Sequence, residues 1–449
     1  MARHCTEAGL IQKAARLWGK AGQRSLERSA LVEAAEQLTR ALSQIGTLPT
    51  TAALRREQIK LQVALITPLI HVKGYASPET KAAAEQASLL IEQAEALGEP
   101  PEDPLWLFSA LYGVWVSSYV AFDGDGVRHR AAQFLSLAEK QTATPPLMVG
   151  HRLMGVSLLC TGNPAQALPH FGRALALYHP AEHRALAMRF SVDTRVSVLC
   201  YRSWALWSLG YPQAAVADID QALDDAREIG QAATLMYVQA HALWLQLWIG
   251  NYVAASRLVE EGVALADEKR AMHWKTLGMI GRGCLFSVTG DASNALRMIT
   301  SGISAYRSTG ATAWMAMILS YMARNCAALG KFEDAWRCID EALLTVETTK
   351  ERWREAEVHH TAGEIALMAP NPDAAKAEEY FERALVVARA QQAKSWELRA
   401  TMSMARLWRD QGKRRQAHDL LAPVYGWFTE GFGTLDLKQA RALLEQLKP

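Results

Sequence analysis

Four glycines recur at an interval of forty residues along the chain, at Gly210, Gly250, Gly290 and Gly330, and Gly412 follows 82 residues later. A self-similar period of this length is typical of proteins built from stacked supersecondary units. The chain has 449 residues, whereas a single hydrophobic core stops growing at roughly 250 to 300 residues. No Gly/Ser/Pro-rich linker divides the sequence, so the period favours one open-ended array over several separate domains.

The composition indicates an all-α protein. Apolar residues make up 50% of the chain, Ala and Leu dominate, and β-branched runs bounded by turn residues are scarce. The 48 basic and 46 acidic side chains leave a net charge of only +2. A chain with so small a net charge has no global field for a polyanion, so nucleic acid is not an expected partner.

The termini and cysteines suggest a soluble cytoplasmic protein with no membrane partner. The N-terminus, which begins Met1–Ala2–Arg3–His4, lacks an apolar stretch of signal-peptide length, and no apolar run is long enough to span a bilayer. The six cysteines include no Cys-x-x-Cys pair. We expect them to be reduced and to pack in the interior rather than to form disulfides or bind zinc.

Each loop glycine is followed by the same residue types at the same offsets. An alanine stands five residues after it, a bulky apolar residue nine after it, and a small residue in most units twelve after it. Offsets that differ by four and three place these side chains on one helical face. The alanines are Ala167, Ala215, Ala255, Ala295, Ala335 and Ala417, and the bulky residues are Phe171, Ile219, Val259, Ile299, Ile339 and Leu421.

A second helical stretch precedes each glycine, for example residues 311–329 before Gly330. The glycine is expected to end this helix in a left-handed cap, because that conformation is least costly without a Cβ. Each unit is then a helix hairpin whose apolar face is exposed to solvent until neighbouring units stack on it. We therefore expect a superhelix with a concave and a convex side, in which each unit contacts only its neighbours.

This pattern resembles the tetratricopeptide repeat. The best-matching unit contains Gly155, Gly162, Ala167, Phe171 and Ala174. The period here is six residues longer than the 34 residues of that repeat, which lengthens the helices by roughly one and a half turns per unit. The resemblance implies an all-α solenoid of helical hairpins, a right-handed α-α superhelix of about ten helix pairs.

The expected organisation is one continuous superhelix over residues 1–449. It comprises N-terminal unit(s) at 1–46, degenerate units at 54–145, regular units of about forty residues at 147–431 and a C-terminal capping helix at 435–447. The interval between Gly162 and Gly210 is 48 residues, and the surplus falls near residues 183–195. Insertions in solenoids often carry function. His183, Arg189 and Asp193 in this segment are therefore candidates for setting ligand specificity.

The chain as a whole resembles the C-terminal tetratricopeptide region of bacterial signalling fusion proteins. The resemblance is carried by residues 391–395, 398–400, 405–408 and 418–432, and by the opening segments 4–10 and 21–24. In that family a class III adenylate/guanylate cyclase domain or a winged-helix domain precedes an AAA-type ATPase and a long repeat tail. The sequence contains no Gly-x-x-x-x-Gly-Lys-Ser/Thr phosphate loop and no paired cyclase aspartates. Cyclase or ATPase activity is therefore not expected of these residues.

The recurring tryptophans are the most suggestive candidates for a binding surface. Trp274, Trp314 and Trp396 each lie sixteen residues before their loop glycine, and Trp353 falls near the equivalent place in a degenerate unit. The favoured interpretation is that each indole wedges between successive hairpins. The alternative is an aromatic ledge on the inner wall that contacts a peptide or small ligand. A second cluster at helical spacing carries the same two interpretations: Trp204, Trp207, Trp244 and Trp248.

No catalytic, cofactor-binding or metal-binding residues are predicted. Glu355, His359, His360 and Glu364 form two i,i+4 pairs, but adjacent histidines on a helix point in different directions. A solvated helix face is the expected interpretation of these pairs.

The sequence thus predicts a non-catalytic binding and regulatory scaffold. A protein, a peptide or a small-molecule effector would bind along the concave groove and shift the superhelix between curvatures, and so bias a signalling cyclase or ATPase. The alternative is that the chain is the tail of an adenylate/guanylate cyclase or ATP-hydrolysing enzyme whose catalytic domains lie outside it. Helical-repeat RNA binding is disfavoured by the near-neutral charge.

Overall fold

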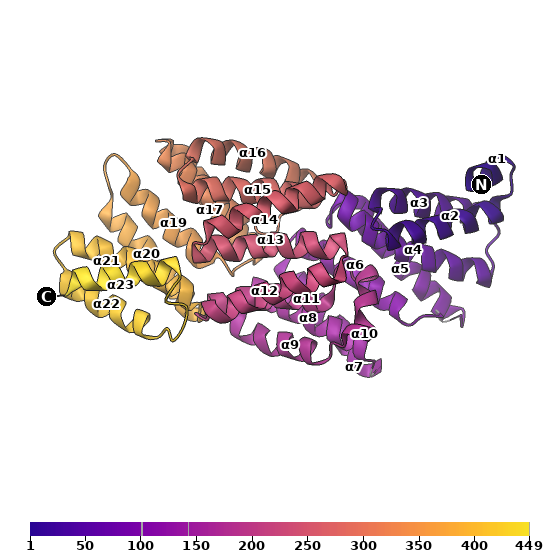
Figure 1. Ribbon diagram of the computed structural model, residues 1–449, viewed down its shortest axis with the longest axis horizontal. Helices are drawn as coiled ribbons and strands as arrows, with labels where there is room; N and C mark the ends of the chain where they lie inside the picture. The colour runs from indigo at the N-terminus through magenta and orange to yellow at the C-terminus, as the bar shows by residue number, and fades with distance from the viewer. Residues whose placement is uncertain (100–101, 142, 449) are drawn as a thin grey trace.

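The computed structural model describes residues 1–99, 102–141 and 143–448. In this part of the chain there are 23 α-helices and no β-strand. Figure 1 shows an elongated molecule with its N-terminal helices at one end and its C-terminal helices at the other. No helix in the described ranges is both long enough and apolar enough to cross a membrane.

Twenty of the helices form ten antiparallel hairpins, which confirms the predicted all-α class and the number of helix pairs. The first helices of the hairpins are α2 (Ile11–Glu27), α4 (Ala52–Lys73), α6 (Leu105–Val120), α8 (Thr144–Cys160), α11 (Thr194–Ser208), α13 (Ala232–Ile249), α15 (Met272–Thr289), α17 (Met315–Ala328), α19 (Glu355–Met368) and α21 (Lys394–Asp410). The second helices are α3 (Leu31–Ile45), α5 (Pro78–Ala96), α7 (Gly124–Gln141), α9 (Pro164–Ala176), α12 (Pro212–Ile229), α14 (Tyr252–Glu268), α16 (Ala292–Ser308), α18 (Phe332–Thr349), α20 (Ala374–Ala390) and α22 (Arg414–Gly426). The remaining elements are α1 (Ala2–Glu7), α10 (Pro180–His183), the 3₁₀ helix η1 (Arg184–Met188) and α23 (Leu435–Leu447).

The periodic residues act locally as their types predict. The loop glycines Gly210, Gly250, Gly290, Gly330 and Gly412 have φ of 90°, 82°, 94°, 75° and 82°, which are left-handed conformations that most side chains avoid. The six alanines that follow these turns and the turn at Gly162 are all fully buried. Repeated hairpins therefore arise from repeated caps and repeated close helix contacts.

From α4 onward the first helix of each hairpin lies inside the superhelix and is more buried than the second, which lies outside. Fifteen of the eighteen residues of α13 are buried, against four of the seventeen residues of α14. A helix that is apolar all round must be covered on all sides. The inner helices therefore need a further covering layer beyond their own hairpin partner.

The superhelix supplies this layer by winding back onto itself. After five hairpins the chain returns, so that α15 lies against α4 and α21 against α11. The amides of Thr312 and Ala313 both donate to the carbonyl of Val120 at the end of α6, at 2.8 and 2.9 Å. Those of Arg352 and Trp353 donate to the carbonyl of Cys160 at the end of α8, at 3.0 and 3.3 Å. We call this line of contact between the two superhelical turns the seam.

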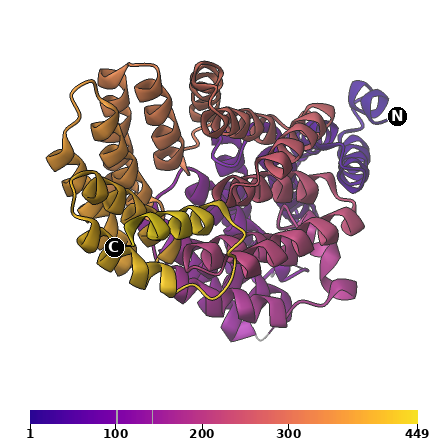
Figure 2. The ribbon, with the colours of Figure 1, turned by 60° about the vertical axis from the view of Figure 1, so that its left-hand side comes forward.

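The seam shows that two predictions were wrong, namely that each unit contacts only its neighbours and that the concave side is an open groove. Units contact not only their neighbours but also the hairpin five units further on, and the inner wall is largely covered where the second turn packs on the first. In Figure 2 the yellow C-terminal helices lie beside the magenta helices of the first turn, in agreement with the contact between α21 and α11. The concave side along the seam is therefore an interior rather than an open groove.

The helix expected over residues 311–329 begins only at Met315. Trp314 has a left-handed φ of 65°, and its amide donates to both carboxylate oxygens of Glu351 at 2.9 Å. Residues 312–313 leave the helical path because their amides bind Val120 across the seam. Tertiary hydrogen bonds here outweigh the local helical preference.

Candidate functional site

The structure brings the eight candidate tryptophans together along the seam. Each is at most 5% exposed: Trp204, Trp207, Trp244, Trp248, Trp274, Trp314, Trp353 and Trp396. The ring of Trp204 in the first turn lies 5.4 Å from that of Trp314 and 5.2 Å from that of Trp353 in the second turn. Trp207 meets Trp396 in the same way, at 4.6 Å. The indoles therefore pack between superhelical turns as well as between successive hairpins.

His183, Arg189 and Asp193 lie apart from this cluster and have partners of their own. Asp193 caps α11 by accepting from the amide of Val196, and it also accepts from the hydroxyl of Tyr178 at 2.6 Å. Arg189 pairs with Asp103, and the Nδ1 of His183 accepts from the amide of His179 at 2.9 Å.

The overlong segment around these residues ties α11 to α4. The hydroxyl of Thr67 donates to the carbonyl of Met188 at 3.1 Å, and the Nε2 of His71 donates to that of Ser191 at 3.2 Å. In this arrangement the candidate specificity residues stabilise the packing of the segment.

The His/Glu pairs of α19 do not form the solvated face that the sequence suggested. His360 is only 5% exposed and shares a 2.8 Å hydrogen bond with the hydroxyl of Ser403 in α21. The expectation failed because α19 is an inner helix, which α21 and the neighbouring hairpins cover. Among the described residues no group of three or more His, Cys, Asp or Glu side chains could hold a metal ion.

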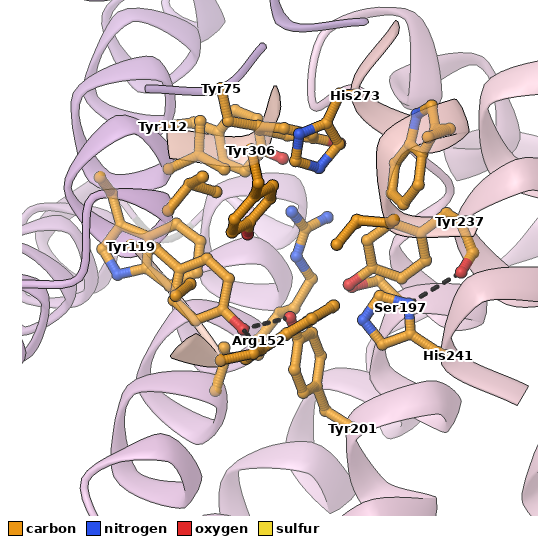
Figure 3. A pocket seen from close by; sticks show the side chains of 18 residues that line it. Tyr75, Tyr112, Tyr119, Arg152, Ser197, Tyr201, Tyr237, His241, His273 and Tyr306 are labelled. Carbon is orange, nitrogen blue, oxygen red and sulfur yellow. Dashed lines mark hydrogen bonds between the residues drawn. The ribbon is translucent and has the colours of Figure 1, made fainter. Parts of the chain in front are cut away.

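An aromatic cavity opens at the seam between the two turns (Figure 3). The empty space between its side chains is about 510 Å³ when the solvent-open mouth is counted with it. The first turn contributes Tyr75, which follows α4, and residues of α6, α8 and α11. The first helix of the sixth hairpin, α13, contributes further residues, and α15, α16 and the segment before α17 complete the wall from the second turn. Its lining comprises Tyr75, Tyr112, Trp115, Val116, Tyr119, Val120, Arg152, Val156, Ser197, Tyr201, Tyr237, His241, His273, Trp274, Leu277, Tyr306, Ala313 and Trp314.

Two of the predicted tryptophans, Trp274 and Trp314, form part of this wall, and seam contacts hold both. The indole of Trp274 donates to the Nδ1 of His71 in α4 at 3.1 Å, and that of Trp314 donates to the hydroxyl of Tyr119 in α6 at 3.2 Å. Tyr119 in turn shares a 2.7 Å hydrogen bond with Tyr201. The cavity wall is thus a single network that both turns complete.

Arg152 is a candidate site residue that the repeat pattern did not indicate. It lies in the middle of α8 and is only 3% exposed, and Figure 3 shows its guanidinium among the labelled aromatic rings. Its carbon Cζ lies 5.0 Å from the ring centroid of Tyr112, while Nε and Nη1 have no hydrogen-bond partner. It is the sole charged side chain of α8. That solitary Arg, in an inner helix without any Lys, Asp or Glu, is the sequence signal that could have identified it.

Burial keeps His241, His273 and Tyr75 of the cavity neutral near pH 7. Burial lowers the pKa of His241 and of His273 to about 3, and it raises the pKa of Tyr75 well above its usual value. The Nδ1 of His241 donates to the carbonyl of Tyr237 at 2.8 Å, which leaves its Nε2 as an acceptor without a partner. The hydroxyl of Tyr75 and the Nδ1 of His273 are also buried without partners.

A second, polar cavity of about 640 Å³ lies nearer the C-terminus, between α13, α17, α19, α21 and α23. Two of its arginines are paired with carboxylates, Arg324 with Glu364 at 2.6 Å and Arg399 with Asp436 at 2.8 Å, and a third, Arg406, donates to the amide oxygen of Gln439 at 3.3 Å. The contrast with the unpaired Arg152 singles out the aromatic cavity as the candidate binding site.

No protein-family model matches the chain. An uncharacterized protein of Rhizobium meliloti (strain 1021) is 27% identical over 421 residues, which cover 91% of this chain and 39% of that protein. The chain therefore spans about two fifths of the length of this relative.

Among solved structures, the chain is similar to a Rap protein in complex with competence and sporulation factor. The identity is 11%, the TM-score is 0.57, and the match covers 88% of this chain and 100% of the Rap chain. At this identity the likeness concerns the fold. The chain is a tetratricopeptide-type helical-repeat solenoid.

Proposed function

We propose that the chain is a ligand-binding regulatory scaffold, and that its ligand occupies the aromatic cavity at the seam. The observation that carries the proposal is that both superhelical turns line the cavity, with buried polar atoms left without partners. A ligand there contacts both turns at once and stabilises their association. Binding thereby favours one curvature of the superhelix over others.

Two comparisons support this proposal. The Rap protein that shares the fold was solved in complex with a factor, so arrays of this type hold ligands. The longer Rhizobium relative has room for further domains beyond the region that matches this chain. We infer that a change of curvature acts on an attached or associated effector, and the family resemblance points to a signalling cyclase or ATPase as that effector.

The alternative is that the chain is the tail of an adenylate/guanylate cyclase or ATP-hydrolysing enzyme. Calorimetry with ATP and magnesium separates the two proposals, because nucleotide binding by this chain favours the enzyme. A protein or peptide that inserts one side chain or terminus into the cavity remains compatible with the scaffold.

A screen of small neutral and anionic ring compounds tests the scaffold proposal directly. Thermal shift identifies binders, and hydrogen–deuterium exchange then reports on the seam segments 309–315 and 350–354. We expect binders to slow exchange in both segments, since both depend on the seam. Ala313→Leu places a larger side chain in the cavity and is expected to abolish this effect, provided that its melting curve stays cooperative. Binding that leaves seam exchange unchanged, or that survives Ala313→Leu, would contradict the proposal.

A further inference from the structure

Arg152 carries an unpaired positive charge in the interior of the protein. The guanidinium lies on the inner helix α8, and no described carboxylate forms an ion pair with it. Burial of an ion costs several kcal/mol unless a counter-charge and hydrogen bonds offset it. The face of Tyr112 offsets part of this cost by a cation–π contact, but it supplies no acceptor for Nε or Nη1.

The cavity wall provides no such counter-charge. His241 and His273 are neutral because burial lowers their pKa values, and burial raises the pKa of Tyr75 and of Tyr119, so these hydroxyls carry no charge. Glu351 does not line the cavity and is already engaged, since it accepts from the Trp314 amide and from the Trp353 indole at 2.9 Å. An anion that completes the site must therefore enter from outside the chain.

We propose that the aromatic cavity selects a compact apolar or aromatic molecule that bears one carboxylate, and that Arg152 is its anion anchor. This inference rests on the proposed function and names the chemical class of its ligand. A single guanidinium matches a single negative charge. A phosphate dianion would leave one charge unbalanced in an apolar enclosure, so the geometry favours a monoanion.

The remaining features of the cavity define the rest of the ligand. Trp115, Trp274 and Trp314 offer aromatic surface to an apolar body. The hydroxyl of Tyr75 lacks a partner and can donate to the carboxylate. The Nε2 of His241 can only accept, and Figure 3 shows it turned towards the cavity, so a hydroxyl or N–H group on the ligand would satisfy it.

A carboxylate of this kind has two sources, a free small acid or the C-terminus of a peptide that ends in an aromatic residue. The recognition chemistry is the same for both. The probes are therefore two matched pairs: 2-naphthoate with 2-naphthamide, and an acetylated tripeptide ending in phenylalanine carboxylate with its C-terminal amide. Each pair differs mainly in the charge that Arg152 would bind.

Isothermal titration calorimetry on the full chain, in a phosphate-free buffer, measures all four probes. We expect at least one acid to bind about tenfold to a hundredfold more tightly than its amide, which is the range for a hydrogen-bonded charge. Arg152→Met should abolish this difference. Arg257→Met removes a side chain that is 64% exposed and should leave the difference intact. The pair that shows the preference identifies the source of the carboxylate.

Equal affinity of acids and amides for the wild-type chain would overturn the carboxylate inference and leave the scaffold proposal standing. Failure of both acids to bind, while neutral ring compounds still protect the seam, would have the same consequence. Failure of every compound would overturn the scaffold proposal itself. If Arg152→Met does not fold, the ratio of acid to amide affinity on the wild-type chain decides alone.

Discussion

The indole of Trp204 stacks on that of Trp353 with ring centroids 5.2 Å apart and an angle of 5° between the planes. Trp204 belongs to α11 in the first superhelical turn, and Trp353 immediately precedes α19 in the second. Offset parallel stacking of this kind adds to the free energy of burying two large rings. The seam is therefore an energetic feature of the protein as well as a geometric one.

Replacement of Trp204 by alanine should lower the free energy of unfolding by about 3–5 kcal/mol, because it leaves a large void at the seam. Equilibrium urea denaturation followed by circular dichroism measures the loss. Trp18→Ala is the matched control, since Trp18 in α2 is only partly buried and lies away from the seam, so its loss should cost only about 1–2 kcal/mol. Equal losses for the two variants would argue against the seam as a packed core.

Two glycines of one hairpin should respond in opposite directions to alanine. A Cβ at Gly155 in α8 would stand 2.5 Å from the ring of Phe171, whereas a Cβ at Gly172 in α9 would meet no atom within 4 Å. Gly155→Ala should therefore destabilise the protein by about 1–3 kcal/mol through overpacking. Gly172→Ala should stabilise it by about 0.5–1 kcal/mol through lost chain entropy. Thermal unfolding of the two variants checks both signs.

Deletion of one period, residues 251–290, should disrupt the seam although the repeats themselves remain intact. The deletion moves every later hairpin by one unit, so the segments that bind the carbonyls of Val120 and Cys160 no longer face them. We expect loss of the single cooperative urea transition and faster hydrogen exchange at the ends of α6 and α8. Deletion of residues 1–50 is the control, because it removes only α1–α3 and leaves the seam intact. If the internal deletion variant unfolds as cooperatively as the wild-type chain, the contacts across the seam do not contribute to cooperativity, and each unit depends only on its neighbours.

Burial raises the pKa of Glu351 to about 7 from its ordinary value near 4.5, despite the hydrogen bonds that its carboxylate accepts. Between these two pH values the folded chain holds a proton that the unfolded chain has lost. The contribution of Glu351 to the free energy of unfolding therefore falls as pH rises through this window. Relative to Glu351→Gln, wild type should lose about 2–3 kcal/mol of stability between pH 5 and pH 8.

Urea denaturation of both chains at several pH values measures this difference. The buried histidines titrate in both chains, so the comparison isolates Glu351. A difference in stability that stays constant with pH would show that the carboxyl is ionised throughout the window.

The repeat was predictable because its causes are local. A glycine that must adopt positive φ, such as Gly250, and an alanine that must admit a close helix contact, such as Ala255, act within one hairpin and recur in the next. The hairpins, their caps and the all-α class could therefore be predicted from spacing alone. The tryptophans could be identified as candidates by their repetition, but their partners could not.

Tertiary structure alone decided which residues share a site. The number of hairpins per superhelical turn depends on a small rotation between neighbours that accumulates over five units, and no local pattern specifies it. That rotation places Trp314 beside Tyr119, covers the inner wall, and encloses Arg152 among aromatic rings. Local sequence patterns are sufficient to specify the hairpin and its repetition, whereas the seam and its cavity exist only because one superhelical turn packs on the other.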